Sequence, residues 1–116
     1  SSQSIIDKAK LYIQENYAKE LSLESVADQV FLHPVYFSKL FKQYAGVNFT
    51  DYLTRTRMNK AIELLAQRKH KMYEISRMIG YANSKYFNRV FKQFTGCTPR
   101  EYSRIHFGLA GMDRDE

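Results

Sequence analysis

The stretch GYANSKYFNRVFKQFTGCTPREY, at residues 80–102, decides the fold of this chain. Its centre, YFNRVFKQFTG at residues 86–96, matches the earlier stretch YFSKLFKQYAG at residues 36–46, at a spacing of fifty residues. Aromatic residues and a closing glycine occupy the same places in both stretches. A shorter helical pattern precedes each stretch, so each copy has the form of a helix, a tight turn and a second helix. The repeat therefore predicts two helix-turn-helix units in one chain.

The two copies differ in the length of the turn. Tyr52 matches Tyr102 at the same spacing of fifty, but upstream Ala27 matches Ser76 at a spacing of forty-nine. We therefore expect the turn of the second copy to be one residue longer. Ala27 and Ser76 are both small, as is needed where two helices cross closely. An open array of stacked repeats needs more copies than this chain has, so we expect two lobes held together by the helix between them.

Signals for the ends of helices occur along the whole chain. Ser22 and Thr98 precede periodic apolar segments as N-caps, and Pro34 and Pro99 suit the first position of a helix. The expected fold class is all-α, with seven helices in two helix-turn-helix lobes joined by a long linker helix. The helices are expected at about residues 4–17, 23–30, 34–44, 49–67, 72–79, 84–94 and 99–105. The expected domain is residues 1–107, with lobe one at about 5–47, the linker helix at about 48–67, lobe two at about 68–105 and a flexible tail at 108–116.

Charge and composition narrow the class of function. Residues 33–104 carry 14 basic and 4 acidic side chains, within a chain whose net charge is +6. A basic middle between mildly acidic ends fits either one face that binds a polyanion or an ordinary solvated basic surface, and charge alone favours neither. Cys97 is the single cysteine and the three histidines lack metal-ligand spacing, so we expect no metal, no cofactor and a reducing, cytoplasmic location. We expect neither a membrane span nor catalysis, because no long apolar run and no catalytic constellation occurs in the sequence.

Helical periodicity divides the second helix of each copy into two faces. The apolar stripes are expected to form the core, and the polar stripes are expected to face outward. The inward positions are Phe37, Leu40, Phe41 and Tyr44 in the first copy, and Phe87, Val90, Phe91 and Phe94 in the second. The outward positions are Val35, Ser38, Lys39 and Lys42 in the first copy, and Lys85, Asn88, Arg89 and Lys92 in the second.

The outward stripes suit the major groove of DNA. Arginine and lysine pair with guanine O6 and N7, and asparagine pairs with adenine N6 and N7. Val35 has two open interpretations, contact with a thymine methyl group or packing on a neighbouring loop of the protein. The candidate base-contacting residues are Val35, Ser38, Lys39, Lys85, Asn88 and Arg89. The candidates for contact with the DNA backbone are Lys42, Lys92, Arg55 and Arg100.

These residues resemble the C-terminal DNA-binding domain of the AraC/XylS family of bacterial transcription regulators. The resemblance covers about residues 5–105 and is most specific at Gly80-Tyr81, Asn83-Ser84, Tyr86-Phe87, Arg89, Phe91-Lys92, Gly96, Thr98-Pro99 and Tyr102. It implies that the second helix of each unit enters the major groove, and that the base-contacting positions are those named above. Two departures stand out. Lys71 replaces the usual Ser or Thr cap, so the start of the fifth helix is expected to fray, and Ser76 replaces the usual alanine.

The leading hypothesis is a sequence-specific regulator, an activator, that reads two major-groove segments of double-stranded DNA about 10 bp apart. The resemblance implies a further N-terminal domain that senses a ligand or receives a phosphorylation signal, and activation implies RNA polymerase as a partner. The first helix is most similar to members fused behind a response-regulator receiver. The alternative is a basic helical module that binds a protein and does not read DNA sequence. A DNA binder should lose affinity steeply with salt, and the alternative should not.

Overall fold

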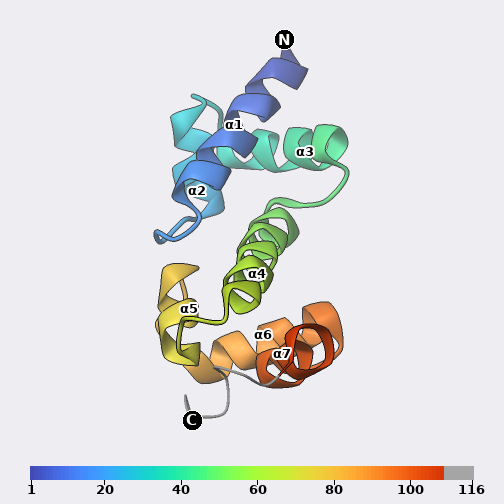
Figure 1. Ribbon diagram of the computed structural model, residues 1–116. Coiled ribbons are helices and arrows are strands. Elements are labelled where there is room, and N and C mark those ends of the chain that lie inside the picture. The colour runs from blue at the N-terminus through green and yellow to red at the C-terminus, as the bar shows by residue number, and fades with distance from the viewer. Residues whose placement is uncertain (109–116) are drawn as a thin grey trace. The chain divides into compact units, whose positions relative to one another are not determined.

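The structure is a computed structural model that describes residues 1–108, and it is all-helical there (Figure 1). The predicted fold class and the number of helices are confirmed for these residues. The helices are α1 (Ser2–Asn16), α2 (Leu23–Gln29), α3 (Pro34–Ala45), α4 (Phe49–Gln67), α5 (Met72–Met78), α6 (Ser84–Thr95) and α7 (Pro99–Phe107). The flexible tail that the sequence predicts at 108–116 lies, apart from Gly108, outside the described residues.

The chain divides into two compact units, which we call the first unit (Ser1–Thr56) and the second unit (Arg57–Glu116). The division falls within α4, so each unit receives one part of this helix. In the first unit α1, α2 and α3 pack against one another, and in the second unit α6 packs on both α5 and α7 (Figure 1). Each unit therefore contains one helix-turn-helix, formed by α2 and α3 or by α5 and α6.

The core of the first unit is built around the aromatic side chains of α3. The Phe37 and Phe41 rings lie 5.6 Å apart between centroids, and the Phe41 ring meets the Tyr52 ring edge-on at 5.4 Å. The Tyr52 hydroxyl accepts a hydrogen bond of 2.8 Å from the Gln14 amide, which ties α4 to α1. The buried residues of this core are Ile6, Ala9, Ile13, Val26, Ala27, Phe37, Leu40, Phe41, Phe49 and Leu53.

The second unit repeats this arrangement at the matched positions. The Phe87 and Phe91 rings lie 5.8 Å apart, and the Phe91 ring meets the Tyr102 ring edge-on at 5.5 Å. The expected match of Tyr52 with Tyr102 is therefore present in space. Each buried aromatic ring removes a large apolar area from water and so fixes its helix in the unit. The buried apolar residues here are Met58, Ala61, Leu64, Leu65, Met72, Ile75, Ile79, Tyr81, Phe87, Val90 and Phe91.

Two positions of the predicted inward stripes are wrong. Tyr44 keeps 36% of its surface exposed and Phe94 keeps 38%. Both lie in the last turn of their helices, next to the exposed glycines Gly46 and Gly96. Since these helix ends lie at the surface, their last aromatic ring is covered only in part. The other inward residues of both helices are buried as predicted.

Local signals set most of the helix ends as expected. The Thr98 hydroxyl accepts from the Glu101 amide at 3.2 Å, and the Glu101 carboxylate accepts from the Thr98 amide at 2.8 Å, which together form a capping box. Gly46 and Gly96 end α3 and α6 in the left-handed conformation, with φ of 82° and 95°. The last helix extends to Phe107, two residues beyond its predicted end at Ile105.

The start of α5 lacks a side-chain cap at Lys71, as the sequence predicts, but a different hydrogen bond is present there. Lys71 offers no side-chain acceptor, but the Glu74 carboxylate accepts a hydrogen bond of 2.7 Å from the Lys71 backbone amide. An acidic side chain in the first turn also interacts favourably with the positive end of the helix dipole. Glu74 thus supplies one of the two bonds of a capping box, the one to the N-cap amide, while the bond that a Ser or Thr side chain would give to the Glu74 amide is missing.

Candidate nucleic-acid interface

The second helix of each helix-turn-helix presents a polar, largely basic face. On α3, Lys39 and Lys42 are exposed, Ser38 is half-buried and Val35 keeps 60% of its surface exposed. This face turns away from the buried stripe of Phe37, Leu40 and Phe41. The exposure of Val35 places its side chain toward solvent and not in the packing of the first unit.

The corresponding face of α6 carries more hydrogen-bonding groups. Lys85, Arg89 and Lys92 are exposed and Asn88 is half-buried. The outward and inward stripes are cleanly separated on this helix, because Phe87, Val90 and Phe91 are all buried. The second unit therefore offers two cationic side chains and one amide in the first two turns of α6, where the first unit offers one cation, one hydroxyl and one apolar side chain on α3.

A side-chain cap orders the first turn of each of these helices. Asn83 Oδ1 accepts from the backbone amides of Lys85, at 2.8 Å, and Tyr86, at 3.2 Å. In the first unit His33 Nδ1 accepts from the Val35 amide at 3.3 Å. Both candidates at the helix start, Val35 and Lys85, are thus attached to backbone that is already fixed. In helix-turn-helix proteins the first turns of the recognition helix contact the base edges, so this rigidity lies where base reading needs it.

The turns differ by one residue, as the sequence predicts. The Leu32 amide donates to the Ala27 carbonyl at 3.0 Å, and the Tyr81 amide donates to the Ser76 carbonyl at 2.9 Å. The N-caps of the following helices, His33 and Asn83, are fifty residues apart. The extra residue in the second turn is therefore Ala82, which lies between Tyr81 and Asn83.

Ser76 does more in the second turn than fill a small space. It is fully buried, and its hydroxyl donates a hydrogen bond of 2.8 Å to the Tyr81 carbonyl. Together with the backbone bond between the same two residues, this fixes the turn that leads into α6. Sequence reasoning found the size of this side chain but missed its hydrogen bond, because the partner is a backbone group across the turn.

Sequence reasoning also missed the two tyrosines that precede the buried phenylalanines. Tyr36 is 53% exposed and Tyr86 is 47% exposed, so neither belongs to the core. The Arg89 guanidinium lies over the Tyr86 ring, 5.3 Å from its centroid. The signal was present in the spacing, since residues three apart on a helix are neighbours. The spacing alone does not reveal a function, because the repeat already explains why both tyrosines recur.

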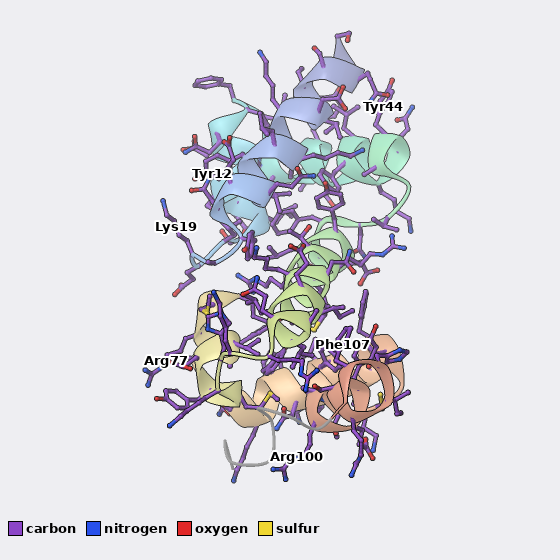
Figure 2. All side chains as sticks on the ribbon, in the orientation of Figure 1. Tyr12, Lys19, Tyr44, Arg77, Arg100 and Phe107 are labelled. Atoms are coloured by element: carbon purple, nitrogen blue, oxygen red, sulfur yellow. The ribbon has the colours of Figure 1, made fainter. Side chains whose placement is uncertain are left out.

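The candidates for backbone contact do not lie in equal surroundings. Lys42 and Lys92 are exposed near the ends of α3 and α6, and Arg55 is exposed on the part of α4 that belongs to the first unit. Arg100 is half-buried in the first turn of α7, which leaves less of its side chain for a phosphate. Figure 2 labels Arg100 and also Arg77, whose exposed side chain extends from α5 with its guanidinium 5.5 Å from the centre of the Tyr73 ring.

Within residues 1–108 no three potential ligands among His, Cys, Asp and Glu lie close enough together to hold a metal ion. No helix in this range has the length and apolar character that crossing a membrane requires. One carboxyl has a clearly shifted pKa. The hydrogen bonds that Glu101 accepts at Thr98 lower the pKa of Glu101 below its ordinary value of 4.5. This shift belongs to the cap of α7.

Known proteins are similar in sequence to this chain over most of its length. A family described as "Helix-turn-helix domain" matches residues 26–105. The regulatory protein PocR of Salmonella typhimurium is 41% identical over 99 residues, which cover 85% of this chain and 33% of PocR. The chain thus spans about a third of the length of that relative.

Solved structures share the fold as well. The C-terminal domain of AraT, a response regulator from Geobacillus stearothermophilus, is 39% identical with a TM-score of 0.85, over 88% of this chain and 85% of that one. A Chromobacterium violaceum transcriptional regulator described as containing an AraC-type DNA-binding domain is 28% identical with a TM-score of 0.80, over 90% of this chain and 92% of that one. The sequence and the fold therefore agree on the same group of proteins.

Proposed function

The chain belongs to the AraC-type helix-turn-helix family of transcription regulators, whose members bind DNA, and we propose which of its residues read the DNA sequence. Residues 1–107 act as one DNA-binding domain, in which α3 and α6 are the recognition helices. They enter successive major-groove segments of one duplex. The observation that carries this proposal is the matched geometry of the two helices. Each is anchored by buried phenylalanines on one face, and each has a capped first turn and carries exposed cationic side chains on its other face.

Base reading is assigned to the first two turns of each recognition helix. On α6, Lys85 and Arg89 pair with guanine, and Asn88 pairs with adenine. On α3, Lys39 pairs with guanine, Ser38 donates or accepts one hydrogen bond, and Val35 contacts a thymine methyl group. The exposure of Val35 supports the thymine interpretation over packing on a protein loop. The second unit thus contributes more hydrogen-bonded discrimination, and the first more apolar contact.

Phosphate contact is assigned to the exposed cations farther along the helices. Lys42 and Lys92 each lie three residues beyond the last base-reading residue of their helix, and Arg55 lies on α4. Arg100 is the weakest member of this set because it is half-buried. Such contacts position the protein on the duplex without reading its sequence.

The partners follow from the length of the relatives. Because the chain spans about a third of PocR, and because the AraT match is a C-terminal domain, we propose that an N-terminal sensor or receiver domain controls this one. The full-length regulator activates transcription by recruiting RNA polymerase to the promoter. It acts in the bacterial cytoplasm, where the chromosome lies. No cofactor or metal takes part in DNA reading by this domain.

A salt titration tests the phosphate contacts and separates DNA reading from a protein-binding module. We expect the logarithm of the duplex-binding constant to fall linearly with the logarithm of salt concentration, by about 0.9 for each phosphate contacted. Lys92→Ala should make this slope shallower by about one contact. Lys8→Ala removes an exposed cation from α1, outside the recognition helices, and serves as the matched control. A flat salt dependence of the unchanged protein would leave the protein-binding alternative standing.

A further inference from the structure

Four side chains of the second unit contact one another in a row that ends at the recognition helix α6, in the order Arg57, Tyr81, Tyr86 and Arg89. The Arg57 guanidinium lies 5.1 Å from the centre of the Tyr81 ring. The Tyr81 ring meets the Tyr86 ring at 5.5 Å and a steep angle of 69°, and the Arg89 guanidinium lies 5.3 Å from the centre of the Tyr86 ring. The row thus starts on α4, passes through the turn and ends on the outer face of α6.

The inner end of this row is firmly held. Tyr81 is buried, and its ring stacks on the buried Phe87 ring at 6.2 Å. The backbone of Tyr81 is fixed by its two hydrogen bonds with Ser76. The ring of Tyr86, although 47% exposed, therefore rests on a rigid support and not on a mobile side chain.

The outer end of this row is the side chain that the proposed function assigns to guanine. An exposed arginine samples many rotamers, and ordering them on binding reduces affinity. A guanidinium that stacks on an aromatic ring loses part of this freedom, while the N–H groups at its edge stay available for bidentate hydrogen bonds. The Tyr86 ring therefore restricts the Arg89 side chain and leaves the N–H donors of the Arg89 guanidinium available.

We propose that Tyr86 is a positioning residue, which orders the Arg89 guanidinium for guanine before DNA binds. The inference rests on the proposed role of Arg89 and deepens it. The first unit offers an internal comparison. Tyr36 occupies the matched place, but Lys39 stands where Arg89 stands, and among the described residues Tyr36 has no cation over its ring. A lysine is a compact point charge and lacks the flat surface that stacks. Preorganisation of this kind is thus specific to the second unit.

A double-mutant cycle on base discrimination tests this proposal. The base pair read by Arg89 is first identified as the one whose preference Arg89→Ala reduces most, on a duplex where a measurable preference is left. The discrimination is then the ratio of affinities for duplexes that carry guanine or another base at that place. Tyr86→Ala should lower this ratio by about two- to fivefold, the size of an exposed cation–aromatic contact. Tyr86→Phe should retain the ratio, because the ring face is kept. In the Arg89→Ala background, Tyr86→Ala should have no further effect on it.

Controls separate positioning from a structural role. Tyr36→Ala removes the matched ring of the first unit and should leave discrimination at the Arg89 base pair unchanged. Should Tyr86→Ala unfold the second unit, Tyr86→Leu keeps the apolar volume without the ring and should give the same loss of discrimination. An equal loss of affinity for all sequences, or a loss that persists in the Arg89→Ala background, overturns the role of Tyr86 alone. If Arg89→Ala changes no base preference, the assignment of Arg89 fails and the role of Tyr86 fails with it.

Discussion

The difference between the two recognition helices is open to a direct test with two double variants. One variant carries Lys85→Ala and Arg89→Ala in the second unit, and the other carries Val35→Ala and Lys39→Ala in the first. The measured quantity is the ratio of affinities for a selected duplex and a scrambled duplex at one fixed salt concentration. All four side chains are exposed, so their truncation removes little buried surface and should not unfold either unit.

The expected magnitudes follow from what each side chain can offer to a base. A good bidentate contact contributes about 1–3 kcal/mol of discrimination, and the second unit loses two cations that can make one. The first unit loses one such cation and the apolar contact of Val35, which contributes roughly 1 kcal/mol for the area of a few methyl groups. With a middle value of about 2 kcal/mol for each bidentate contact, the second-unit variant should therefore lose about 1 kcal/mol more discrimination, or about fivefold in the affinity ratio.

Competition binding followed by fluorescence anisotropy gives this ratio, and thermal unfolding of each variant checks the fold. Because each variant also removes cations, affinity alone would mix phosphate attraction with base reading, whereas the ratio cancels most of the sequence-independent part. An equal or larger loss in the first-unit variant would refute the assignment of roles to the two helices.

Four further substitutions test the fold that holds the interface. Ser76→Ala should lower the free energy of unfolding of the second unit by about 1–2 kcal/mol in urea denaturation, because the Tyr81 carbonyl loses its donor; no change would mean that the bond adds nothing. Gly80→Ala, at a φ of 105°, should cost about 1–2 kcal/mol. Phe31 occupies the matched place in the first unit, with a φ of 60° and a ring that is 93% exposed. Phe31→Gly should change the free energy of unfolding by less than about 1 kcal/mol, because glycine adopts this φ without strain. If Phe31→Gly and Gly80→Ala lowered the free energy of unfolding equally, backbone strain would not explain the effect at Gly80. The pKa of Glu101 is lowered in the fold, so its contribution is present above the unfolded value near 4.5 and is lost as pH falls through the folded pKa. Acid titration of thermal unfolding should show this loss, and Glu101→Gln should remove it.

Local chemistry explains why most of the fold could be predicted. Ser22 and Thr98 cap their helices through bonds to residues three places along the chain, and such partners are visible in sequence. The repeat also predicts which residues pack alike, because the ring contacts Phe41–Tyr52 and Phe91–Tyr102 occur at the same spacing of fifty residues. At the start of α5 the missing Ser or Thr cap is visible in the sequence at Lys71, and Glu74, three places along the chain, supplies only the reciprocal bond to the Lys71 amide.

What could not be predicted depends on how helices end and on how segments meet. The exposure of Tyr44 and Phe94 depends on what covers the last turn, which periodicity does not report. The contact of Tyr81 with Arg57 joins the turn before α6 to α4, and it cannot be predicted from helical spacing because the two residues lie far apart in the sequence. The base-reading residues themselves remain predictions, because exposure and a capped first turn show only that they are available for DNA.

The central claim is that α3 and α6 both read base sequence, and selection of bound duplexes from random DNA tests it most directly. The selection is run with the unchanged protein at two salt concentrations. We predict a recovered motif with two blocks of preferred bases, which persists at the higher salt while total binding falls. The block assigned to α6 should contain guanine and should weaken in a repeat with Arg89→Ala. Recovery of no motif at either salt concentration, or of a single block that Arg89→Ala leaves intact, would contradict the claim.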